Sequence, residues 1–343
     1  MNQKAFKKDP DILTIGGTKI KRGERIKLQL DCAALYDYTK LTIPVEVIRG
    51  VEKGPVLFIS AAIHGDELNG IEIIRKLLKK KFLKKIKGTL ILVPIVNVFG
   101  VLNKSRYLPD RRDLNRSFPG SRNGSLANRL AYIFMKEIVS KCTHGIDLHT
   151  AAIHRTNLPQ IRACLDDKVT KELAEGFGAP VVINSNLRDG SLREAARRKN
   201  VSMLLFEGGE ALRFEENIIS KGLRGCISVM NKIGMVTDIK PLKKKSNIFI
   251  AKSSFWVRAP RSGIFSVHKK IGANISEGDL LAVISDPFGG ESLNIIADED
   301  GILIGAALLP LVNQGDAMFH IATFRDSAKV KRAIEKHNEF DAD

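Results

Sequence analysis

Two residues able to do chemistry stand close together in the stretch His64-Gly-Asp-Glu67. The apolar run at 55–59 before them predicts a buried strand, and the apolar residues after them are spaced as on one helix face. In a parallel α/β sheet this junction is the carboxyl end of a strand, where ligands bind. A histidine and a glutamate three residues apart on the first turn of a helix can bind one ion, and zinc accepts both. The alternative is an ordinary helix start whose acidic residues face the helix dipole.

Three more polar residues lie at the ends of predicted strands. Asp147 and His149 are two apart in the strand at 145–150, so they share one face. Glu207 directly follows the buried strand at 201–206. Two histidines and one carboxylate form a ligand set of the catalytic zinc type, which leaves a further carboxylate to take a proton from water and another to support a histidine. Each residue alone has a structural explanation, but their convergence at one sheet edge favours a metal site.

A long polar loop at 103–123 adds anion-binding chemistry. It carries Arg106, Arg111, Arg112 and Arg116. Loops of this length inside a compact domain are usually functional or disordered. Arginine forks suit carboxylates, and beside a metal one arginine could hold a developing oxyanion. For Arg111 and Arg112 a basic surface loop is a sufficient explanation.

The elements that must position these residues alternate between strands and helices over residues 51–240. This alternation predicts an α/β fold with a mainly parallel, mixed central sheet flanked by helices. The predicted strands are 55–59, 89–93, 145–150, 181–183 and 201–206. The predicted helices are one that runs from Ile71 through a lysine-rich stretch to Lys87, then 126–138, 192–198 and 214–233.

The chain divides into four predicted segments. Residues 1–50 are β-rich and are expected to pack on a catalytic domain at 51–240. Short strands separated by glycines predict a small all-β domain at 248–325, and a charged tail follows at 326–343.

Composition excludes several classes of protein. A hydrophobic content of 44% and a charged content of 27% are typical of globular proteins. No apolar run reaches the roughly 20 residues of a membrane span, and no signal peptide is visible. Four scattered cysteines without a CxxC pair fit reduced thiols, so we expect a cytoplasmic protein. The net charge of +17 is explained by a solvated lysine-rich helix face, and no nucleic-acid-binding motif occurs.

The order of four motifs resembles the succinylglutamate desuccinylase/aspartoacylase family of the zinc carboxypeptidase superfamily. These motifs are His64-Gly-Asp-Glu67, Asp113-Leu-Asn-Arg116 followed by Phe118-Pro119, Asp147-Leu-His-Thr150 and Phe206-Glu207-Gly-Gly209. The resemblance covers about residues 50–235. The HxxE motif alone is not specific, but the joint order of all four is.

The resemblance implies a zinc carboxypeptidase-like fold that holds one Zn2+ per chain. Its ligands would be His64, Glu67 and His149, with Asp147 in support. Glu207 would activate water and pass the proton to the leaving nitrogen, and Arg106 matches the arginine that polarises the scissile carbonyl.

Three further residues are assigned to substrate binding by the same resemblance. Asn115 and Arg116 match the pair that holds the substrate carboxylate. Arg193, in Gly190-Ser-Leu-Arg193, is a candidate for a second anion contact.

The C-terminal β unit resembles the barrel-sandwich fold of biotinyl and lipoyl carriers. The carrier lysine is missing, and Asp286-Pro-Phe-Gly-Gly290 occupies the middle of the unit. We therefore expect a structural or site-capping module.

The sequence thus predicts a zinc-dependent amidohydrolase that deacylates a small N-acyl amino acid or a similar amide with a free carboxylate. The expected partner is a small anionic substrate, with no nucleic acid and no membrane, and assembly into a homo-oligomer stays open. One alternative is a metallocarboxypeptidase acting on short or modified peptides, and an ester substrate also stays open. A second is a non-catalytic basic binding protein, which would have no reason to keep His64, Glu67, His149 and Glu207 together.

Overall fold

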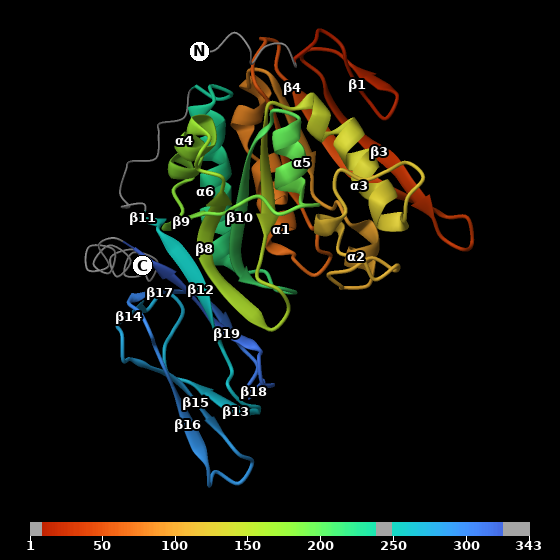
Figure 1. Cartoon of the computed structure of the whole chain (residues 1–343). Helices are drawn as coiled ribbons and strands as arrows, with labels where there is room; N and C mark the ends of the chain where they lie inside the picture. Colours follow the sequence, from red (N-terminus) through yellow and green to blue (C-terminus); the bar gives the residue numbers. More distant parts are fainter. Residues whose placement is uncertain (1–8, 238–248, 325–343) are drawn as a thin grey trace.

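The computed structural model describes residues 9–237 and 249–324 (Figure 1). The lysines at 243–245 and the tail at 326–343 lie outside the described residues. None of the described helices is both long and apolar enough to span a membrane.

A large mixed sheet forms the centre of the molecule, and its middle is parallel. The parallel strands lie in the order β10 (Ser202–Glu210), β7 (His144–His149), β5 (Val56–Ala61) and β6 (Thr89–Val93). On one side the sheet continues with β4 (Lys40–Arg49) and β3 (Arg25–Ala34). On the other side it continues with β8 (Arg155–Ala163), β17 (Gly301–Ala307), β19 (Ala317–Thr323) and β12 (Ser253–Arg258). These flanking strands pair antiparallel to their neighbours along that order.

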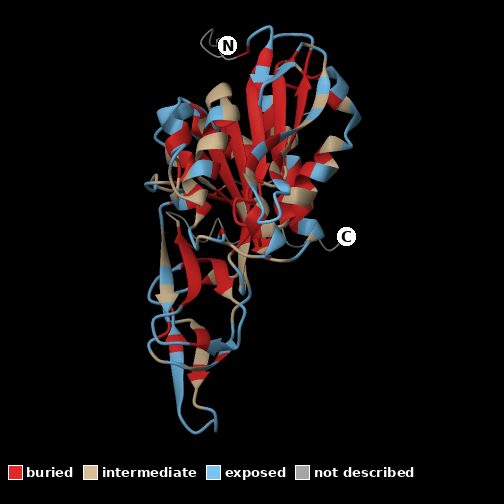
Figure 2. Ribbon diagram, turned by 90° about the vertical axis from the view of Figure 1, so that its right-hand side faces the viewer, coloured by how far each residue is buried: buried red, intermediate tan, exposed pale blue. Residues whose placement is uncertain are grey.

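Helices cover both faces of the sheet, as β5 illustrates. Val56 and Phe58 pack in one core and Leu57 and Ile59 in the other, because successive side chains of a strand point to opposite faces. The first core includes α3 (Leu126–Glu137) and α5 (Leu192–Arg198), beside the short α2 (Val98–Leu102). The second core includes α1 (Asn69–Leu78), α4 (Lys168–Phe177) and α6 (Glu216–Lys232). Figure 2 shows the buried strands between helices whose outer faces are exposed. The predicted α/β class with a mixed central sheet is confirmed.

Two expectations about local structure need correction. The lysine-rich stretch is not one helix, because α1 ends at Leu78 and a separate 3-10 helix covers Lys81–Lys85. Lys80 between them has an extended backbone, and the break lets Leu83 and Ile86 reach the core. The sequence also indicated no element at 151–180, where β8 and α4 lie.

The C-terminal residues form antiparallel β-structure that extends the central sheet. Strand β17 pairs with β8, so the sheet runs without a break from the parallel strands into this unit (Figure 1). A second, four-stranded sheet packs with it; its strands are β13 (Gly263–Val267), β15 (Leu280–Ser285), β16 (Ser292–Ile296) and β18 (Leu311–Val312).

The remaining elements are short. They are the hairpin β1 (Leu13–Ile15) and β2 (Thr18–Ile20), the strands β9 (Val181–Asn184), β11 (Phe249–Ala251) and β14 (Asn274–Ile275), and the 3-10 helices Leu114–Arg116 and Val139–Lys141.

Candidate active site

Three buried side chains gather at the carboxyl end of the parallel strands. One ligand atom from each of His64, Glu67 and His149 lies within 4.8 Å of the others. The first two residues lie in the tight turn between β5 and α1 rather than on the helix itself, which begins at Asn69. A glycine is required in this turn, because a Cβ on Gly65 would lie 1.8 Å from a backbone carbon of Gly100. The predicted ligand set is therefore brought together, although not on a first helical turn.

Glu67 bridges the two imidazoles. Its Oε1 lies 2.7 Å from Nδ1 of His64, and its Oε2 lies 2.7 Å from Nδ1 of His149. The far nitrogens meet other carboxylates: Nε2 of His149 is 2.7 Å from Asp147, and Nε2 of His64 is 3.1 Å from Asp113. An imidazole that donates from Nε2 presents the lone pair of Nδ1 to the centre, which is the arrangement found around metal ligands.

The supporting carboxylates are themselves held in place. Asp147 accepts a hydrogen bond of 2.7 Å from Ser60, as expected of a residue that orients His149. Asp113 had no assigned role from the sequence, although it opens the motif that ends at Arg116. In the structure, Asp113 contacts His64, 49 positions away in the chain, and this gives it a supporting role like that of Asp147.

The charges of Asp147, Glu67 and the two histidines oppose the effect of burial on the pKa values of Glu67 and His149. Burial opposes ionisation of Glu67, but the charges of His64 and His149 outweigh it and lower the pKa of this carboxyl. Burial also opposes protonation of His149, yet Asp147 and Glu67 raise its pKa well above the usual value. The cluster thus joins an ionised carboxylate to two imidazoles of raised basicity, and a cation can bind these groups by taking the place of the protons on the imidazoles.

Arg106 reaches the same centre from the long loop. Its Nε and Nη2 donate to Oδ2 of Asp113 at 3.2 and 2.9 Å. Its Nη1 donates to Oε1 of Glu67 at 3.3 Å and lies 3.2 Å from Nδ1 of His64. The Arg106 guanidinium therefore lies next to the histidine cluster and also lines the cavity. Arg111 and Arg112 do not line the cavity, in agreement with a surface location.

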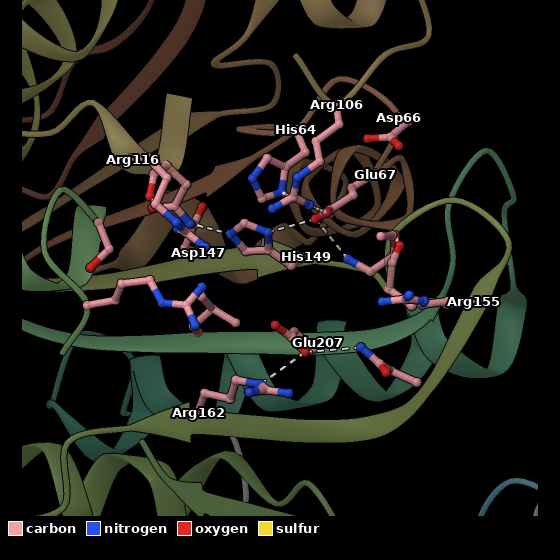
Figure 3. A pocket seen from close by; sticks show the side chains of 18 of the residues that line it. His64, Asp66, Glu67, Arg106, Arg116, Asp147, His149, Arg155, Arg162 and Glu207 are labelled. Atoms are coloured by element: carbon pink, nitrogen blue, oxygen red, sulfur yellow. Dashed lines mark hydrogen bonds and ion pairs between the residues drawn. The ribbon is translucent and has the colours of Figure 1, made fainter. Parts of the chain in front are cut away.

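Glu207 lies beside the cluster on the next strand. Strand pairing puts it opposite His149 (Figure 3). Its Oε2 accepts hydrogen bonds from Asn157 at 3.0 Å and from Arg162 at 3.1 Å. Both donors come from β8, which the sequence did not predict.

A cavity of about 1200 Å³ joins these groups to the predicted substrate residues. Asn115 lines it, and its Oδ1 accepts a hydrogen bond from the backbone N–H of Leu192, so its amide NH2 is the free donor end. Arg116 lines it too, with Nη1 on the carbonyl of Asn115 at 2.5 Å. Arg193 lines it as well and donates to the backbone oxygen and hydroxyl of Ser185.

The C-terminal β unit closes part of this cavity. Trp256 and Arg258 of β12 and Ala317 of β19 line it together with the residues of the catalytic part. Over the whole lining, eight side chains are basic and four are acidic.

The comparisons with known proteins agree with this arrangement. The model of the succinylglutamate desuccinylase/aspartoacylase catalytic domain matches residues 53–233, more than half of the chain. The chain belongs to this family. The family includes deacylases of N-acyl amino acids, which indicates that this chain is an amide-bond hydrolase.

Individual relatives share both sequence and fold with this family member. The N-alpha-acetyl-L-2,4-diaminobutyric acid deacetylase of Halomonas elongata is 27% identical over 299 residues, which cover 83% of this chain and 86% of that protein. A succinylglutamate desuccinylase/aspartoacylase from Rhodobacter sphaeroides has a TM-score of 0.79 at 23% identity and covers 88% of this chain and 96% of its own. The ectoine utilization protein EutE (DoeB) from Ruegeria pomeroyi has a TM-score of 0.78 at 23% identity, with coverage of 87% and 95%. These two structures share the fold.

Proposed function

We propose that the protein is a zinc-dependent hydrolase that cleaves the amide bond of a small N-acyl amino acid carrying a free carboxylate. One observation carries the proposal: His64 and Glu67 follow β5, His149 ends the adjacent β7 and Glu207 lies opposite it on β10, and all four line one cavity.

The donor set fits a zinc ion. Zinc prefers imidazole nitrogen and carboxylate oxygen, and three protein ligands leave a position for water or substrate. Both imidazoles have a carboxylate on the nitrogen that faces away, and such partners raise the basicity of a ligand and fix its orientation. One ion per chain would be held by His64, Glu67 and His149. A zinc ion there supplies a Lewis acid and lowers the pKa of a water molecule to about 7.

The remaining roles follow from what each side chain touches. Glu207, held on one oxygen by Asn157 and Arg162, would take a proton from water and deliver it to the leaving nitrogen. Arg106 would stabilise the charge that develops on the carbonyl oxygen, because its Nη1 borders the ligand cluster.

Substrate orientation would come from the 3-10 helix Leu114–Arg116. Arg116 and the amide of Asn115 would hold the carboxylate of the substrate. Arg193 donates its hydrogen bonds to Ser185, so it would shape the cavity wall rather than make the main contact with the substrate.

The cavity favours this function over peptide hydrolysis. Trp256 and Arg258 of the C-terminal unit form part of its wall, which limits the length of chain that fits. A metallocarboxypeptidase acting on short peptides would use the same groups, and dipeptides tested beside N-acyl amino acids separate the two functions. The four cysteines, all within the described residues, form no disulfide, which supports the cytoplasm as the location.

The deciding experiment measures metal content together with amine release from a panel of N-acyl amino acids. We expect one zinc per chain and release that a chelator abolishes and added zinc restores. Protein that binds no metal even when zinc is supplied would contradict the proposal.

A further inference from the structure

The carboxylate of Glu207 is held on only one of its two oxygens. Asn157 and Arg162 both donate to Oε2, at 3.0 and 3.1 Å, and both come from β8 (Figure 3). Among residues 9–237 and 249–324, no protein group forms a hydrogen bond with Oε1. Oε1 is therefore the oxygen that can take a proton from water.

The nitrogens that hold Oε2 suit only one of the two forms that the proposed base adopts. Both the guanidinium of Arg162 and the side-chain NH2 of Asn157 are donors and accept no hydrogen bond. In the proposed reaction Glu207 takes a proton from water and later passes it to the leaving nitrogen. Between these transfers it is a carboxylic acid, whose O–H needs an acceptor.

Gln160 lies directly opposite Glu207 on β8. The two residues are partners in the antiparallel pairing of β8 with β10, and Gln160 lies between Asn157 and Arg162 along the strand. Cross-strand partners share a face of the sheet, with Cβ atoms about 4.5–5.5 Å apart. Gln160 does not line the cavity and is 0% exposed, so it lies beneath the base.

Neither end of the Gln160 amide has a partner. Within the part of the chain that the structure describes, both Nε2 and Oε1 are buried and form no hydrogen bond. A buried amide without a partner destabilises a fold, so such a group calls for an explanation, either a role or a bound water. The amide carries a carbonyl acceptor beside its NH2 donors. Gln160 thus offers the acceptor that the acid form of Glu207 lacks.

A second buried and unpaired group, His320, lies too far from the base to do the same. Its Nδ1 has no hydrogen-bond partner in the described chain, and its ring stacks on Trp256 with centroids 4.3 Å apart and planes 4° apart. His320 belongs to β19, which β17 and β8 separate from β10. Because neighbouring strands lie about 4.8 Å apart, the two backbones are roughly 14 Å apart. His320 is therefore beyond hydrogen-bond reach of Glu207.

We propose that Gln160 is a positioning residue for Glu207: its carbonyl accepts a hydrogen bond from the carboxylic acid that forms when Glu207 takes a proton from water. The proton moves from water to Oε1 of Glu207, and a half-turn of the carboxyl group points the O–H at Gln160. The reverse turn returns the same proton to the cavity, where the leaving nitrogen takes it as the C–N bond breaks. Gln160 itself gains and loses no proton. This inference rests on the proposed hydrolase function.

The contact is tested without turnover in the Glu207→Gln background, because the neutral amide NH2 stands in for the O–H of the acid. Urea unfolding of the full-length chain is followed by the fluorescence of Trp256, its only tryptophan. In the parent protein Gln160→Met should leave the urea midpoint unchanged or raise it, because an apolar side chain of similar length replaces an unpaired amide. In the Glu207→Gln background the same change should lower the midpoint, because it removes a hydrogen bond.

Kinetics of the zinc-loaded enzyme test the role itself. Gln160→Met should lower kcat by about tenfold, the effect of one hydrogen bond, and change KM by less than about twofold. Zinc content should stay the same. Gln160→Asn keeps the amide on a side chain one methylene shorter and should recover part of the loss. Asn274→Leu is the matched control, because it removes an amide with a buried, unpaired Oδ1 on β14, outside the cavity, and it should leave kcat unchanged.

An equal effect of Gln160→Met on the urea midpoint in both backgrounds would overturn the inference and leave Gln160 as a site for a buried water. An unchanged kcat, or a loss of kcat shared by Asn274→Leu, would overturn it too. The proposed function has a separate readout, because it fails if the parent protein binds no zinc or releases no amine. The unfolding comparison needs no activity and still decides whether Gln160 contacts the side chain at position 207.

Discussion

Glu207 lies directly opposite His149 in the parallel pairing of β10 with β7. The strand register therefore fixes the proposed base relative to a proposed metal ligand, while Asn157 and Arg162 hold the carboxylate of Glu207 through hydrogen bonds from β8. We expect Glu207→Gln to keep the metal and to lower kcat by about 10²- to 10⁴-fold, the usual contribution of a general base. Zinc content and kcat, measured on the same preparation, check this. Normal hydrolysis by the Gln variant would show that another group takes the proton.

Loss of a metal ligand should weaken zinc binding more than loss of the carboxylate that holds that ligand. His149→Ala should abolish stoichiometric zinc binding, because one of three ligands is lost. Asp147→Asn and Asp113→Asn should keep a site that binds zinc about tenfold to a hundredfold more weakly, the usual effect of a partner behind a ligand. Competition with a zinc-binding dye measures the affinities. Asp298→Asn, an exposed position of the C-terminal unit, is the control and should leave the affinity unchanged.

Asn115 combines a structural contact with an expected substrate contact, and two variants separate them. Asn115→Ala leaves the N–H of Leu192 without its partner at the start of α5, which should cost about 1–3 kcal/mol of unfolding free energy. Asn115→Asp keeps an acceptor for that N–H, so stability should be retained. It replaces the free NH2 with a negative charge, so KM should rise at least tenfold, by repulsion of the substrate carboxylate. Thermal unfolding and steady-state kinetics check both. An unchanged KM in the Asp variant would remove Asn115 from the substrate contacts.

The sequence predicts those parts of the fold whose side chains obey one simple pattern. The strand at 89–93 and the helix at 192–198 coincide with β6 and α5, because four of the five residues of the first are apolar and the second has a clear start at Ser191. The four motifs also gave the ligand cluster, since each lies where a strand ends or a loop folds back on it.

Strand β8 escaped prediction for a physical reason. It contains Pro159, which argues against a central strand, and one of its faces carries Asn157 and Arg162 toward the cavity. The register with β10 also shifts between Glu207 and Gly209, where β8 carries one extra residue, and this allows Asn157 and Arg162 to face the cavity together. The partners of Glu207 depend on this strand and could not be found by spacing alone.

Gly305 makes room for Asn157, and this gives a test of how the C-terminal unit supports catalysis. A Cβ at Gly305 would lie 2.8 Å from Oδ1 of Asn157 and 3.1 Å from Cβ of His320. Gly305→Ala should therefore displace the side chain that donates to Glu207 and lower kcat by about tenfold to a hundredfold. Zinc content should not change.

The control for Gly305→Ala is Gly301→Ala on the same strand. Its added Cβ would meet Ile321 at 2.5 Å, far from Asn157 in the register of the sheet. It should cost stability, about 1–3 kcal/mol as for other overpacked sites, and spare kcat. If both variants lowered kcat equally at a temperature where both are folded, the effect would be one of general destabilisation.

His320 should make the stability of the protein depend on pH. Burial, with Arg162 nearby, lowers the pKa of His320 to about 3, whereas an unfolded chain takes up this proton near a pKa of about 6.5. Between these values the unfolded state binds more protons, so the free energy of unfolding falls as the pH falls. From pH 7 to pH 5 this group accounts for a loss of about 2 kcal/mol.

His320→Phe keeps a ring against Trp256 and removes the titrating group, so it should lose less stability between pH 7 and pH 5 than the parent protein does. Urea unfolding followed by the fluorescence of Trp256 measures this difference. Part of the dependence should remain, because burial also lowers the pKa of His144, to about 4, with the same sign. His268→Phe, at an exposed histidine of the same unit, serves as the control. Parallel losses in the parent and in His320→Phe would mean that His320 accepts its proton without unfolding, and that the stack on Trp256 tolerates charge.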